Sequence, residues 1–110
     1  MPSQPKCFAQ VALGSSLSTL YTVPGSGVIA DMPSILLVNC GTAATVRLYA
    51  VAPGDVPQVK NAIAYDVLVE AGETKVLALG VVLGPEWTIQ GWASQANIIA
   101  MHLNGLEVTP

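Results

Sequence analysis

Charged residues are scarce in this sequence: 10% of its residues are Asp, Glu, Lys or Arg, against about 25% in an ordinary soluble domain. Four basic and seven acidic residues give a net charge of −3. Phosphate binding needs clustered Lys and Arg, so we expect no nucleic-acid partner. Hydrophobic residues make up 52% of the chain, which excludes intrinsic disorder of the whole chain.

Long hydrophobic runs are also missing. Gly, Pro, Asn or a charged residue interrupts every apolar stretch well before the ~18–20 residues that a bilayer span needs, so we expect no membrane partner. Residues 1–6 lack a basic region followed by an apolar one, which argues against a secretory signal. The 110 residues fit one domain that is large enough to bury a core without a metal or disulfide.

Residues that carry chemistry are few. The two cysteines, Cys7 and Cys40, form no CxxC pair, and we expect two buried, reduced thiols, with a disulfide as the alternative. His102 is the only histidine, which excludes a multi-histidine metal centre and favours a hydrogen-bonded or solvent-facing strand residue. Asp66 and Glu70 are interpreted as outward, solvated carboxylates, ahead of an acid–base pair or a cation site. We therefore expect no enzyme, no cofactor and no metal site.

Turn residues and β-favouring runs are what the sequence has in quantity. Turn clusters recur about every 8–18 residues, a spacing that suits single strands and is too short for a series of helices. About seven strands are predicted, over residues 16–23, 35–38, 45–51, 63–70, 75–82, 86–93 and 98–103. The run from Ile35 to Val38 is continuously apolar, as expected for a strand buried on both sides. Residues 53–61 are expected to form an exposed loop that crosses from one sheet to the other.

The pattern predicts an all-β fold. We expect a single antiparallel β-sandwich over residues 13–110, either jelly-roll or immunoglobulin-like, preceded by a short extended N-terminal arm over residues 1–12. The strand pattern does not separate the two topologies. Pro2 and Pro5 disfavour regular structure in the arm, and we expect the arm to become ordered only on a neighbouring subunit.

The two tryptophans are the most informative aromatic residues. Trp87 and Trp92 are an odd number of residues apart, so an uninterrupted strand places them on opposite faces. With Trp87 beside Ile89 in the core, Trp92 points outward, where it would serve a protein contact or stack on a sugar. The alternative is a bulge at Gly91 that returns both rings to the core.

Alternation identifies further outward positions. Tyr49 lies opposite Val46 and Leu48 in its strand, and Leu68 shares a face with Asp66. The same alternation places Tyr65 on the other face, with Val67 and Val69.

The contact candidates are therefore Trp92, Tyr49 and Leu68 together with Pro2 and Pro5 of the arm. An outward surface filled by uncharged side chains suits permanent burial against other subunits. We expect a homo-oligomer, with a trimer as the preferred state.

Several short segments occur in a characteristic order: Leu20 to Pro24, Ile35 to Asn39, Ala62 to Asp66, Ala71 to Thr74, and Leu103 to Glu107. Together they resemble a group of small β-rich virion proteins of tailed bacteriophages, over about residues 16–109. The resemblance implies a structural, non-enzymatic virion component, most simply a capsid decoration (cement) protein, or else a small tail or baseplate part. Its partners would be itself and other virion proteins such as the major capsid protein. A carbohydrate- or receptor-binding module that uses Trp92 is the alternative from another class.

Overall fold

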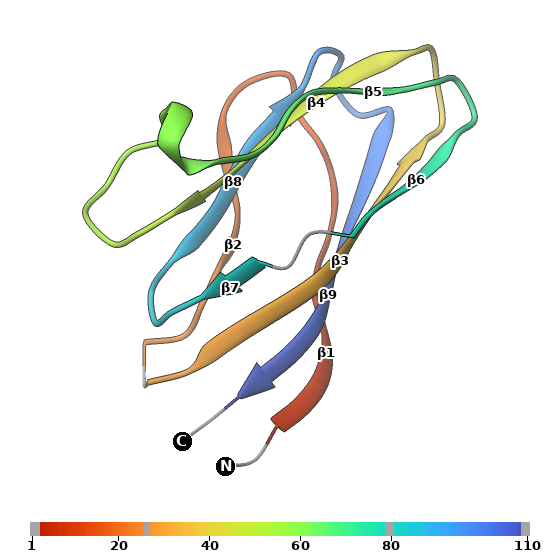
Figure 1. The fold of residues 1–110 in the computed structure, drawn as a ribbon. Coiled ribbons are helices and arrows are strands. Elements are labelled where there is room, and N and C mark those ends of the chain that lie inside the picture. The colour runs from red at the N-terminus through yellow and green to blue at the C-terminus, as the bar shows by residue number, and fades with distance from the viewer. Residues whose placement is uncertain (1–2, 26, 79–80, 109–110) are drawn as a thin grey trace.

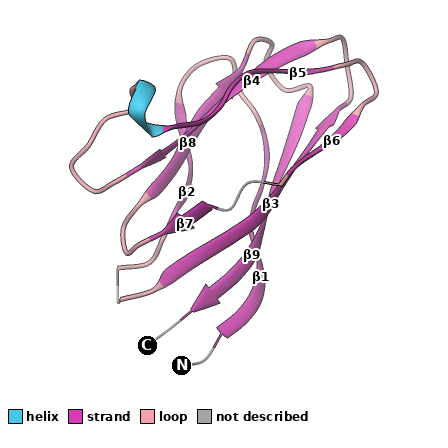
Figure 2. Cartoon of the chain, viewed as in Figure 1, coloured by secondary structure: helices cyan, strands magenta, loops and turns pink. Residues whose placement is uncertain are grey.

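The computed structural model describes residues 3–25, 27–78 and 81–108, and its regular structure is almost entirely β (Figure 1, Figure 2). The strands are β1 (Ser3–Ala12), β2 (Ser18–Thr22), β3 (Ile29–Asn39), β4 (Ala44–Val51), β5 (Ala62–Val69), β6 (Thr74–Leu77), β7 (Val81–Leu83), β8 (Thr88–Ala93) and β9 (Ile99–Val108). Within those described ranges the one helix is the short 3-10 turn η1 (Val59–Asn61).

The strands form two antiparallel sheets that pack into a sandwich. Sheet A has the order β1-β9-β3-β6, with β7 also paired to β3, and sheet B has the order β2-β8-β4-β5. Apart from β4–β5 and β6–β7, consecutive strands lie in different sheets, so the two orders interleave along the chain. This interleaving is the jelly-roll arrangement and not the immunoglobulin one. The predicted antiparallel β-sandwich is confirmed, and its topology is resolved.

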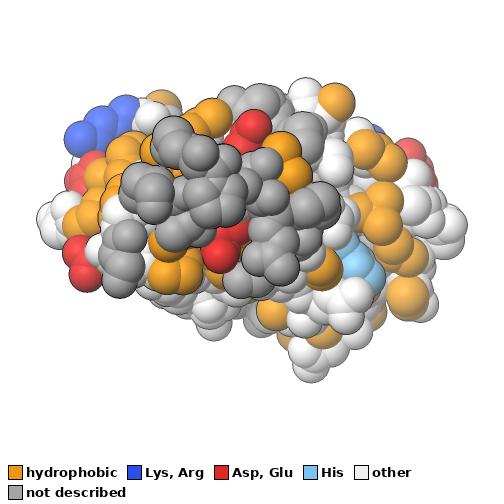
Figure 3. Space-filling model, turned by 90° about the horizontal axis from the view of Figure 1, so that it is seen from below, with side chains coloured by type: hydrophobic (Ala, Val, Ile, Leu, Met, Phe, Trp, Pro, Cys, Tyr) orange, Lys and Arg blue, Asp and Glu red, His pale blue; other side chains and the backbone are white. Residues whose placement is uncertain are grey.

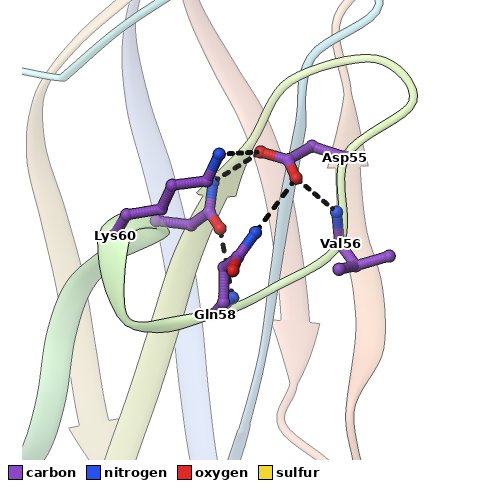
Figure 4. Close-up of polar contacts among 5 residues, drawn as sticks. Asp55, Val56, Gln58 and Lys60 are labelled. Carbon is purple, nitrogen blue, oxygen red and sulfur yellow. Dashed lines mark hydrogen bonds and ion pairs between the residues drawn. The ribbon is translucent and has the colours of Figure 1, made fainter.

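The loop after β4 differs from its prediction. It joins β4 to β5, which are neighbours in sheet B, so it does not cross between the sheets. The carboxylate of Asp55 folds the loop onto itself (Figure 4). Its Oδ1 accepts the backbone N–H of Val56 at 2.9 Å, and its Oδ2 lies 3.2 Å from the Lys60 ammonium. These contacts, the Val56 bond foremost, lower the pKa of Asp55.

The N-terminal segment also differs from its prediction. Residues 3–12 are extended, but they form β1 and pair with β9, with Pro5 opposite Leu106, so in this structure they need no neighbouring subunit to be ordered. β1 is an edge strand of sheet A, where a proline is tolerated because one side of the strand has no ladder. Phe8 anchors the strand by packing into the core. Pro2 lies outside the described residues.

The core lies between the sheets and is apolar. Its largest fully buried side chains are Leu13, Val23, Ile35, Leu37, Val46, Leu48, Leu83, Ile89, Ile99, Met101 and Leu103. Among the described residues, tyrosines aside, the one buried polar residue is Asn39, at the end of β3. Its Nδ2 donates to the carbonyls of Thr42 at 2.8 Å and Val69 at 2.9 Å, and its Oδ1 accepts the N–H of Gly41. The amide is therefore satisfied, and it ties the end of β3 to the end of β5.

The cysteines are free thiols, as expected, but both are exposed and not buried. Cys7 lies on the edge strand β1, where the register with β9 shifts between Cys7 and Ala9. Cys40 follows β3 and begins the turn to β4. The prediction of burial was wrong because it rested on residue type alone and not on position in a strand.

Candidate functional site

Strand β8 places Trp92 on the outer face of sheet B. Ile89, Gly91 and Ala93 are buried toward the core, whereas Trp92 and its alternate neighbours are only partly buried. β8 pairs with β4 without any register shift, so no bulge occurs at Gly91 on this side. The predicted outward orientation of Trp92 is confirmed, and Trp87 packs against the core from just before the strand.

Gly91 has a role that the sequence did not reveal. A Cβ at this position would overlap the backbone oxygen of Arg47 and come within 2.8 Å of the Leu48 side chain. Only glycine permits β8 to approach β4 this closely. The close approach sets Arg47 and Trp92 directly opposite each other across the two strands.

Five side chains, which we call the aromatic–arginine cluster, gather on this outer face: Arg47, Tyr49, Tyr65, Asp66 and Trp92. The rings of Tyr49 and Trp92 stack with centroids 5.7 Å apart and an interplanar angle of 24°. The Arg47 guanidinium carbon lies 4.1 Å from the centroid of Tyr65 and 5.6 Å from that of Trp92. Such contacts between a guanidinium and aromatic faces are favourable, and more so where water is partly excluded.

A bulge in β5 completes the cluster. Val46 pairs with Val67 and Leu48 with Ala64, so β5 has one more residue than β4 over this stretch. Asp66 has a φ of 52°, and both it and Tyr65 are exposed. The prediction that Tyr65 faces inward with Val67 was wrong, because the extra residue reverses the alternation.

Arg47 and Asp66 neutralise each other within the cluster. Nε of Arg47 donates to one carboxylate oxygen at 2.6 Å and Nη2 donates to the other at 3.1 Å. This paired hydrogen bond lowers the pKa of Asp66 and raises the pKa of Arg47. The cluster therefore presents aromatic rings and a neutral ion pair to its surroundings.

Three of the five predicted contact residues share this face. Leu68 is 46% exposed and pairs with Thr45, which alternates with Arg47 and Tyr49 along β4. Tyr49 is only 6% exposed, since Trp92 stacks on it and η1 contacts β4. Tyr49 thus supports Trp92 more than it offers a surface of its own.

The remaining predicted contact residues do not join this site. Pro5 belongs to β1 of sheet A. Pro2 lies beyond the described residues. Arg47, Tyr65 and Asp66 were missed as contact residues, and the bulge that gathers them leaves no signal in the alternation pattern.

The outer face of sheet A is built differently. Gln10, His102, Leu36 and Val76 are aligned by register across β1, β9, β3 and β6. Gln10 Nε2 and His102 Nδ1 are 3.3 Å apart, which agrees with the prediction of a hydrogen-bonded strand histidine. Leu36 and Val76 are uncovered, although the apolar run in β3 predicts burial on both sides.

Within residues 3–25, 27–78 and 81–108 there is no pocket and no group of His, Cys, Asp or Glu placed to hold a metal ion. In the same ranges, no helix has the length and apolar character that crossing a membrane requires. The basic side chains that the structure describes are all engaged. Arg47 pairs with Asp66, Lys60 with Asp55, and Lys75 donates to the carbonyl of Leu68 at 2.7 Å.

Comparison with known proteins shows which fold the chain has, but not its role. The sequence matches no protein-family model and no curated protein. Similar solved structures include the infectious bursal disease virus VP2 subviral particle (TM-score 0.56, 11% identity, 96% of this chain and 32% of that one). The T13 viral particle of the same virus is also similar (TM-score 0.57, 7% identity, 96% of this chain and 30% of that one). The chain thus spans about a third of the viral chains that it matches.

A third similar structure is not viral. The Drosophila NLP core, described in terms of pentamer formation and histone binding, matches with a TM-score of 0.54 and 19% identity. The match covers 94% of this chain and all of that chain. One sandwich architecture therefore serves proteins with different roles, so the role must be argued from the surface.

Proposed function

We propose that this protein is a non-enzymatic structural component of a virus particle, and specifically a capsid decoration (cement) protein of a tailed bacteriophage. The observation that carries the proposal is the aromatic–arginine cluster: rings and a paired guanidinium gathered on the outside of a sheet. Trp, Tyr and Arg are the side chains that dominate the energetics of protein–protein contacts. The contact partner is another virion protein such as the major capsid protein.

Two further observations support a structural role. The fold is shared with domains of virus particle chains, and the ordered segments of the sequence resemble phage virion proteins. The described basic side chains are paired and offer no free cationic patch for phosphates, which supports a protein partner over nucleic acid.

Protein copy number in purified particles tests the proposal. Quantitative mass spectrometry of phage particles grown from the genome that encodes this chain should find it in hundreds of copies per particle. A few to some dozens of copies would place it in the tail or baseplate instead. Its absence from particles would refute a virion role altogether.

Reconstitution tests the contact surface. Particles that lack the protein should bind added wild-type chain, and the Trp92→Ala variant should bind with affinity lower by about 30-fold, as for a buried aromatic anchor of about 2 kcal/mol. Val59→Ala is the matched control, since Val59 is 85% exposed in η1 and outside the cluster. A quench of tryptophan fluorescence by sugars, with no particle binding, would favour the carbohydrate-binding alternative.

A further inference from the structure

We infer that the outer face of sheet A is the surface through which two copies of this chain pair, as a dimer in place of the trimer expected from the sequence. The face is marked by Leu36, Val76, Val82, His102 and Leu106. The inference goes beyond particle binding and does not depend on it, because the aromatic–arginine cluster lies on the opposite side of the sandwich.

The face is largely apolar, and among the residues that the structure describes none packs over it. Val76 and Val82 are 59% and 63% exposed, and Leu106 is 37% exposed. Leu36 and Val38 lie half-buried at the centre of a run whose composition is typical of a strand with a packed layer on both sides. The core covers one side of β3, and the missing second layer is what a partner supplies. Figure 3 shows hydrophobic and uncharged side chains around the histidine.

The charge distribution favours a second copy as the partner. Among side chains that the structure describes, Asp31 is the one charged group on this face, beside Val82 and Leu106 in register. The ion pairs Arg47–Asp66 and Lys60–Asp55 lie in sheet B and its loop. Two copies that each carry a net charge of −3 repel least where they meet through an uncharged surface.

The polar groups of the face complement themselves. They include Gln10, His102, Asn104 and Ser34, aligned as Gln10–His102 and Asn104–Ser34 across neighbouring strands. A neutral amide, imidazole or hydroxyl is both a donor and an acceptor. An identical face therefore offers each group a partner, which a purely apolar or a charged surface would not.

The size of the face is sufficient. The long strands β1, β9 and β3 have 10, 10 and 11 residues, and the short β6 and β7 share the fourth position beside β3. At about 4.8 Å between strands and ~3.3 Å per residue, the face measures about 20 by 30 Å. This flat area, about 600 Å², approaches the ~800 Å² per partner of a standard stable interface. A two-fold axis across the strands at the His102 row would also separate the two Asp31 carboxylates, since Asp31 lies about 16 Å from Leu36 along β3.

Sedimentation equilibrium on the full chain tests the inference. Wild type should be a dimer at tens of micromolar. A variant with Val76→Lys and Val82→Lys should dissociate at least 100-fold more readily, with an unchanged melting temperature when both proteins are melted at a concentration where they are monomeric. Val59→Lys, the same change at an exposed valine outside the face, should dimerise as wild type does. A mixture of the double Lys variant with the matching Val76→Glu and Val82→Glu variant should again form dimers, because opposite charges then face each other.

Chemical modification of the single histidine provides a second measurement that needs no variant. The rate at which diethylpyrocarbonate modifies His102 should fall at least tenfold between protein concentrations far below and far above the dissociation constant. A monomeric wild type at 100 µM would overturn the inference. So would a trimer or dimer that survives in the double Lys variant, since the contact would then lie elsewhere, and so would a His102 rate that does not change with concentration.

Discussion

The two outer faces of this sandwich differ in where their side chains find partners. On sheet B, Arg47 is held by Asp66 and lies over Tyr65, and Trp92 stacks on Tyr49, so the groups are satisfied within one chain. On sheet A, Leu36 and Val76 have no covering layer. The first face is pre-organised before any partner arrives, which lowers the entropic cost of binding. On the second face, these apolar side chains have no second layer of packing among the described residues.

The largest expected effect is on folding stability, at Gly91, where β8 approaches β4 on sheet B. Gly91→Ala should destabilise the fold by about 3 kcal/mol, because the new methyl group collides with the backbone of β4, which cannot move aside cheaply. Urea denaturation measures the loss. Gly14→Ala is the matched control, since a Cβ there meets nothing within 4 Å, and its stability should stay within about 0.5 kcal/mol of wild type. Equal stability of the two variants would show that β8 does not depend on this close approach.

Trp87 packs against the core and is the reference against which the stability effect of the outward Trp92 is compared. Trp87→Ala should cost about 2 kcal/mol of folding stability, less than a fully buried tryptophan, because the ring packs against the core but remains partly exposed. Thermal melts measure the difference. A cost below that of Trp92→Ala would mean that the outer ring, and not the inner one, supports the fold.

Trp92→Ala should cost only about 1 kcal/mol of folding stability, the value of an aromatic stack, in this case on Tyr49. Val76→Ala on sheet A should change stability by less than about 0.5 kcal/mol, because Val76 is 59% exposed in the single chain. Thermal melts compare the two variants. They are run at a protein concentration low enough to keep the chain monomeric. A larger cost for Val76→Ala would reverse the contrast between the faces.

The smallest expected effect is a pH response confined to sheet B. The pKa of Asp66 is lowered from its ordinary 3.8 by the Arg47 hydrogen bond. Its contribution to stability is therefore complete above that ordinary value and is lost as the pH falls through the lower, folded-state value. NMR shifts of the Tyr65 ring should change below about pH 4 as Arg47 is released. Asp66→Asn should abolish the step, and a step that persists in this variant would assign it to another carboxylate.

Much of the fold follows from local pattern. Alternation correctly predicted that Ile89 and Trp92 lie on opposite sides of β8, and turn residues delimited most of the strands. Alternation failed at Tyr65 because one extra residue in β5 is invisible until the strand is paired. The prolines of residues 1–12 suggested a separate arm, but an edge strand tolerates them. The cluster around Arg47 depends on three strands and could not be predicted from any one of them.

The position of β9 has a consequence for how the protein is made. Residues 99–108 are the last strand in sequence, yet they lie between β1 and β3 in the middle of sheet A (Figure 1). During synthesis β1 emerges first and has no sheet partner until β9 has been translated. β3 can pair with β6 and β7 earlier, but β1 and the open side of β3 wait for β9, so this part of sheet A assembles late and from distant segments and is exposed to wrong partners until then. A cell that makes this chain in quantity meets that hazard during its translation.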